Sequence, residues 1–152
     1  MDAPTTPGAW QYSDFGQGMG KRALFFDPDI QTYFSLDCVT QPNGPEILFT
    51  RLGRPGKRYL AMTIRTETAQ RTLSAERVGA ESIMTTVPAT DPLLDAMALS
   101  KGRFAVEVEG EAQLILPSHA EVSRVIEDCR QPSSLRGAAG EAMTKCLPDS
   151  IR

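Results

Sequence analysis

The side chains with the widest chemical repertoire in this chain are its single histidine, His119, and its three cysteines, Cys38, Cys129 and Cys146. His119 and Cys129 both lie in the stretch SHAEVSRVIEDC (118–129). A nucleophile and its base must approach each other within about 3 Å. If the stretch is helical, their separation of ten positions corresponds to roughly 15 Å along the helix axis. The spacing therefore excludes a local Cys–His pair and leaves His119 as a candidate ligand or partner contact.

The same stretch has the pattern of a helix that closes a domain. Ser118 followed by Glu121 predicts a capping box, in which each side chain satisfies a free backbone N–H group. Pro132 prevents the helix from continuing. Residues at spacing i, i+3, i+4 and i+7 form one apolar face: Val122, Val125, Ile126 and Cys129.

The cysteines admit several pairings. Cys38 lies on the apolar face of the alternating run 32–39, and Cys129 lies on the apolar face of the predicted helix. We therefore prefer a Cys38–Cys129 disulfide; the alternatives are Cys129–Cys146 and three reduced thiols. Because the chain has no C-x-x-C, neither a thioredoxin-like pair nor a zinc knuckle is indicated.

The stretch RLGRPGKR (51–58) is the other candidate site, because it groups four cations in one predicted hairpin loop. The cations are Arg51, Arg54, Lys57 and Arg58. With Phe49 and Tyr59 on either side, the loop could contact an anion, a partner or a nucleic acid; the simpler interpretation is a solvated loop. The net charge of −3 argues against a general nucleic-acid binder.

Other motifs fail when their full requirements are considered. GQGMGKR (16–22) resembles a phosphate loop, but Phe15 stands where glycine is needed and Arg22 where Ser or Thr is needed. Asp27 and Asp29 flank Pro28 in a turn, and the remaining carboxylates do not cluster in sequence. We expect neither a metal nor a cofactor.

Alternating apolar and polar residues predict strands along most of the chain. These runs cover 21–27, 32–39, 46–52, 58–66, about 70–76, about 81–87 and a hairpin over 103–116 with its turn at Glu109–Gly110. Their short connections favour antiparallel pairing. Thr90 or Asp91, followed by Pro92, predicts the start of a second helix over about 91–100. We expect a mainly β fold: an antiparallel sandwich or flattened barrel of about seven to nine strands, with short helices at about 91–100 and 118–129.

The chain divides into a flexible arm (1–9), one globular domain (10–131) and a weakly ordered tail (132–152). No apolar run approaches the roughly 20 residues needed to span a bilayer. The lead DAPTTPGA is typical of sequences that follow a removed export signal, so we expect the periplasm or cell envelope, with the cytoplasm as the alternative. The excess of arginine over lysine suits a GC-rich bacterial genome.

The segments DPLLDAMALSKGRFAVEVEG and LPSHAEVSRVIEDCR resemble a family of small, uncharacterised alphaproteobacterial proteins. The resemblance covers about residues 30–130 and implies no activity. The layout is also similar to exported β-sandwich proteins of the invasion-associated locus B family. That family has more cysteines, the first of them close after an early tryptophan, whereas Trp10 has no cysteine near it.

These observations favour a non-catalytic exported or cell-envelope module that binds a protein or a small ligand. One alternative is a small enzyme whose residues converge around His119 from distant segments. The other is a cytosolic anion or nucleic-acid binder that uses the 51–58 loop.

Overall fold

The computed structural model describes residues 4–14, 20–29 and 32–131, and shows nine strands and two helices. The predicted tail (132–152) and most of GQGMGKR lie outside the described residues. The strands are β1 (Ala9–Asp14), β2 (Lys21–Asp27), β3 (Thr32–Gln41), β4 (Gly44–Leu52), β5 (Tyr59–Arg65), β6 (Gln70–Val78), β7 (Ser82–Pro88), β8 (Arg103–Val108) and β9 (Leu114–Pro117). The helices are α1 (Pro92–Leu99) and α2 (Ala120–Arg130).

All nine strands belong to one antiparallel sheet in the order β1-β2-β3-β4-β7-β6-β5-β8-β9. The mainly β prediction is confirmed, and a flattened barrel describes the curled sheet better than a sandwich does.

The prediction that residues 51–58 form a hairpin loop is wrong. The strand β4 pairs with β7, and β5 pairs with β6 and β8, so the connection crosses between strands that are not neighbours. Sequence proximity suggested a hairpin, but β7 occupies the free edge of β4.

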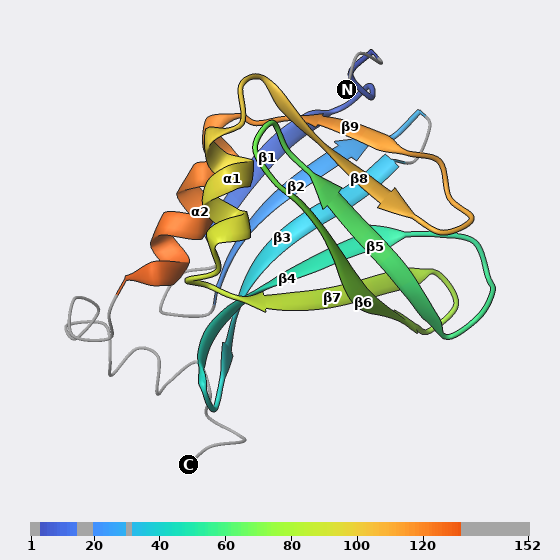
Figure 1. Cartoon of the computed structure of the whole chain (residues 1–152), viewed down its shortest axis with the longest axis horizontal. Coiled ribbons are helices and arrows are strands. Elements are labelled where there is room, and N and C mark those ends of the chain that lie inside the picture. The colour runs from blue at the N-terminus through green and yellow to red at the C-terminus, as the bar shows by residue number, and fades with distance from the viewer. Residues whose placement is uncertain (1–3, 15–19, 30–31, 132–152) are drawn as a thin grey trace.

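The sheet curls around its own apolar face, and both helices lie at one end of the curl (Figure 1). The connections β4–β5 and β8–β9 lie at the opposite end (Figure 1). Helix α2 packs on β1 to β4 and on α1, so its apolar stripe completes the core. The largest fully buried side chains include Phe25, Phe34, Phe49, Phe104, Leu36, Ile47, Met62, Ile64 and Ile83.

The two edges of the sheet, β1 and β9, are joined by side chains and by the chain before β1. The backbone N–H of Thr6 donates to the carbonyl oxygen of Ile115 (2.8 Å), and the N–H of Ile115 donates to Thr6 Oγ1 (2.8 Å). The indole N–H of Trp10 donates to the carbonyl oxygen of Pro117 (2.7 Å). We call these contacts the seam. Part of the predicted arm (1–9) is therefore bonded to β9 at Thr6.

The capping box predicted at Ser118 is wrong. Helix α2 begins at Ala120 with His119 as its N-cap, and no side chain caps it. The hydroxyl of Ser118 instead donates to the carbonyl oxygen of Met97 (2.9 Å) and so links the start of α2 to α1. A tertiary acceptor therefore replaces the local one.

The Cys38–Cys129 disulfide is present, as the two apolar faces predicted. It connects β3 to the buried side of α2, and Cys129 is fully buried.

The start of α1 also follows the prediction. Asp91 is the N-cap, and its Oδ1 accepts the N–H of Leu93 (2.8 Å). Arg71 donates to the other oxygen, Oδ2 (2.6 Å), and this contact lowers the pKa of Asp91 below its ordinary value. The depressed pKa means that the folded state favours the carboxylate over the protonated acid.

Replacing Asp91 with alanine is expected to lower the free energy of unfolding by about 1–2 kcal/mol at pH 7, because the cap and the ion pair are both lost. Since the folded pKa lies below the ordinary value of 3.8, the stabilisation is present above that pH and is lost as the pH falls through the lower, folded value. Urea unfolding at pH 7 and near pH 2.5 measures the difference. An equal deficit at both pH values would contradict this account. Asp91→Asn, which keeps a capping oxygen, is the control.

Candidate functional site

His119, the first candidate, is an exposed residue at the start of α2. It lies at the helix end of the molecule and does not line the cavity described below. The structure thus does not bring it together with the 51–58 cations. Cys129, the other reactive residue of the 118–129 stretch, is held in the disulfide.

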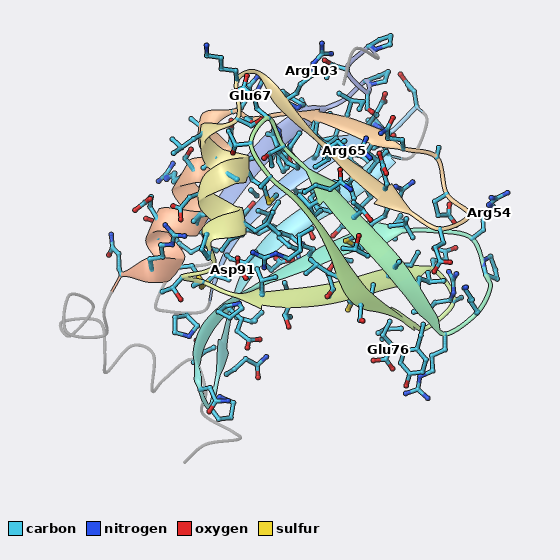
Figure 2. The ribbon with its side chains drawn as sticks, viewed as in Figure 1. Arg54, Arg65, Glu67, Glu76, Asp91 and Arg103 are labelled. Atoms are coloured by element: carbon cyan, nitrogen blue, oxygen red, sulfur yellow. A yellow bond between two sulfur atoms is a disulfide. The ribbon has the colours of Figure 1, made fainter. Side chains whose placement is uncertain are left out.

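The four predicted cations of 51–58 divide into two kinds. Three of them form ion pairs on the surface: Arg54 with Glu111 (3.9 Å), Lys57 with Glu109 (3.1 Å) and Arg58 with Glu76 (2.8 Å). Their side chains are exposed, and Figure 2 shows Arg54 at the end of the sheet away from Asp91 and the helices. Because each cation has an acidic partner, these three do not form a bare positive patch.

Arg51 differs from the other three because it is a strand residue on the inner face of β4. It follows Ile47 and Phe49 with period two, and all three side chains are buried. Only 5% of Arg51 is exposed. The only hydrogen bond that it donates within the described part of the chain runs from Nε to the carbonyl oxygen of Leu52 (3.3 Å). Its buried Nη1 has no partner there.

Arg51 lines a cavity of about 500 Å³. We call it the mouth cavity, since the connections β4–β5 and β8–β9 contribute to it at the end of the sheet opposite the helices (Figure 1). Its described lining residues are Thr6, Thr32, Tyr33, Arg51, Leu52, Gly53, Arg54, Glu81, Glu111, Ala112, Gln113 and Leu114. The volume falls in the range of roughly 300–1,000 Å³ that is usual for small-molecule sites.

Hydrogen bonds hold the wall of the mouth cavity in place. The backbone N–H of Arg54 donates to Glu111 Oε2 (2.9 Å), and a guanidinium N–H of Arg54 donates to the carbonyl oxygen of Gly110. The N–H of Gly53 donates to the carbonyl oxygen of Glu81 (2.7 Å). A Cβ on Gly53 would lie 2.5 Å from Ile83 Cδ1, so a larger residue here would have to displace that side chain. The β4–β5 connection is thereby bonded to the β8–β9 and β6–β7 connections.

The electrostatics of the mouth cavity centre on Arg51. Burial lowers the pKa of Arg51 from its ordinary value, and the negative charge of Glu111 opposes this effect. Nevertheless Arg51 forms no ion pair with any described acid, and Glu111 is bonded to Arg54. A guanidinium stays protonated in proteins. The cavity therefore contains a buried positive charge with free hydrogen-bonding capacity, which suits a carboxylate or another anion.

The sequence pattern identified Arg51 as a candidate contact residue, but the prediction placed it in a loop with the other three cations. The alternation of residues in EILFTRL could have distinguished Arg51 from the other three cations, because it places Arg51 on the same face as Ile47 and Phe49. What the sequence did not indicate is the acidic wall: Glu81 and Glu111 come from other connections.

A second cavity, of about 540 Å³, lies on the outer face of β2, β3, β4 and β7. Two of its charged residues contact each other, since Arg22 Nε donates to Asp37 Oδ1 (2.5 Å). The buried Ser35 hydroxyl also donates to Asp37 Oδ2 (3.0 Å), and Lys21 pairs with Asp14. Because these groups already satisfy one another, this cavity presents a weaker case for a ligand than the mouth cavity.

Within 4–14, 20–29 and 32–131, no group of three or more His, Cys, Asp or Glu residues is placed to hold a metal ion. In the same part of the chain, neither helix has the length and apolar character needed to cross a membrane.

Fold and site together define a curled antiparallel half-barrel that has helices at one end and an arginine-lined cavity at the other. Compared with known protein families, with characterised proteins and with solved structures, the chain shows no match.

Proposed function

We propose that this chain is a non-catalytic binding module of the bacterial cell envelope that holds a small anionic ligand in the mouth cavity. The observation that carries the proposal is the buried guanidinium of Arg51, whose Nη1 has no partner among the described residues. A buried donor without a partner destabilises the folded state by about 1–3 kcal/mol, and more when it is charged. A ligand anion would supply the missing acceptor.

Binding, rather than catalysis, suits the chemistry of this group. Because a guanidinium keeps its proton, it orients and neutralises an anion but does not exchange protons with it. The envelope location is supported by the Cys38–Cys129 bond, since disulfides persist in oxidising compartments.

The test uses acetate as the probe. In NMR spectra of ¹⁵N-labelled protein, acetate is expected to shift the Arg51 Nε–H resonance and the amides of Gly53 and Gln113 saturably, with a Kd on the order of 1–10 mM. Arg51→Met should abolish these shifts. Arg58→Met is the matched control, because it removes an exposed, ion-paired cation of the same connection. Equal shifts in the Arg51→Met protein would refute the site.

The Arg51→Met variant should also differ from the unmodified protein in its free energy of unfolding. Arg51→Met is expected to raise the free energy of unfolding of the free protein by about 1–3 kcal/mol, because an apolar side chain replaces an unpartnered buried charge. Loss of binding together with gain of stability is typical of a residue kept for function. Urea unfolding without acetate measures it, and a loss of stability would show that Arg51 is structural.

A further inference from the structure

We propose that the ligand of the mouth cavity is a small zwitterion, an amino acid or ω-amino carboxylate, whose carboxylate contacts Arg51 and whose ammonium group contacts Glu81. This inference rests on the proposed function and deepens it by naming the ligand class.

The carboxylate end follows from the free edge of Arg51. Since Nε is bonded to the Leu52 carbonyl, the donors left for a ligand are those of Nη1 and Nη2, neither of which has a partner among the described residues. A carboxylate matches a guanidinium edge with two parallel hydrogen bonds, and these are stronger in a site shielded from water. The 5% exposure of Arg51 provides that shielding.

The ammonium end follows from the acids of the same cavity. Glu81 is exposed, and its carboxylate makes no hydrogen bond or ion pair with any described residue. Glu111 is bonded to the Arg54 backbone and is less available. Among the described residues the cavity thus contains a cation and an anion that do not neutralise each other, and a zwitterion complements both.

The same acids disfavour a dianion. Phosphate bound at Arg51 would bring a second negative charge towards Glu81 and Glu111, both of which line the cavity. Like charges in a partly desolvated site repel strongly. Because Glu111 is paired with Arg54, most of this repulsion comes from Glu81.

The experiment measures affinities by calorimetry for matched probe pairs: glycine and acetate, β-alanine and propionate, γ-aminobutyrate and butyrate, with inorganic phosphate as the dianion. In each pair the two probes differ by an ammonium group, and the series scans the distance between the two charges. At least one amino probe should bind roughly tenfold or more tightly than its partner, the effect of one charge-assisted hydrogen bond. Glu81→Gln should reduce that ratio to within about threefold. Glu76→Gln, which alters an ion-paired glutamate outside the cavity, should leave the ratio unchanged.

The outcomes separate the two proposals. If acetate or phosphate binds through Arg51 as tightly as every amino probe, the zwitterion inference is wrong and the anion-binding function stands. If the selectivity survives in Glu81→Gln, the assignment of the ammonium group to Glu81 is wrong. If no probe binds, or if all bind equally to Arg51→Met, both proposals are overturned.

Discussion

Breaking the Cys38–Cys129 bond is expected to lower the free energy of unfolding by about 4 kcal/mol, near the upper part of the roughly 2–5 kcal/mol range known for native disulfides. The bonded cysteines are 91 residues apart in sequence. In the chain-entropy model a loop this long strongly restricts the unfolded chain, so its release favours unfolding. The loss is a large share of the total stability of about 5–15 kcal/mol that is typical of a domain.

The measurement is urea unfolding followed by the fluorescence of Trp10, the only tryptophan. Two comparisons separate the bond from the side chains: the protein that keeps Cys38 and Cys129, with and without reductant, and a Cys38→Ala/Cys129→Ala double variant. All are made in a Cys146→Ala background, so that the third thiol cannot exchange with the pair. A change below about 1 kcal/mol on reduction would mean that packing alone holds α2 to the sheet.

Replacing Trp10 with alanine is expected to remove about 3–5 kcal/mol and to open the seam between β1 and β9. The ring of Trp10 packs edge-on against Phe25, with centroids 5.3 Å apart, and lies 6.5 Å from Phe104. Its N–H donates to the carbonyl oxygen of Pro117 on β9. One side chain therefore contributes both core burial and a link between the two edges of the sheet.

Urea unfolding by circular dichroism gives the total effect, because the fluorescent residue is the one replaced. Hydrogen exchange at the amides of Thr6 and Ile115, which donate hydrogen bonds across the seam, should accelerate selectively in Trp10→Ala. Trp10→Phe, which keeps the ring and loses the N–H, should remove about 1–2 kcal/mol. Phe34→Ala is the control, since this buried residue of β3 lies away from the seam and should lower global stability without a selective effect on β9. Unchanged exchange at β9 in Trp10→Ala would show that Trp10 acts through burial alone.

A charged contact also joins the two helices. Arg130, in the last turn of α2, donates to Asp95 Oδ1 (2.7 Å) and to the carbonyl oxygen of Ala89 (2.6 Å). The position suits the negative end of the helix dipole. The tertiary contact with α1 was not visible from that rule.

Sequence by itself determined the local elements of this protein. Period-two alternation placed β2 to β9 close to their observed bounds, because burial of one face selects side chains two apart. Asp91 followed by Pro92 determined the start of α1, since capping is satisfied within a few residues. The inward faces of 32–39 and 118–129 also anticipated the Cys38–Cys129 bond. Each of these depends on contacts near in sequence or on a single buried face.

Tertiary structure alone decided what depends on distant partners. It paired β4 with β7 rather than with β5, joined Thr6 and Trp10 to β9, and turned the Ser118 hydroxyl from its own helix to Met97. It also separated Arg51 from the other cations of its connection and enclosed it beside Glu81 and Glu111. These long-range contacts depend on the closure of the whole sheet. The free energy of each pairing depends on every other strand edge and hydrogen-bond acceptor that competes for the same partner, and local sequence propensity contains no information on these competitors.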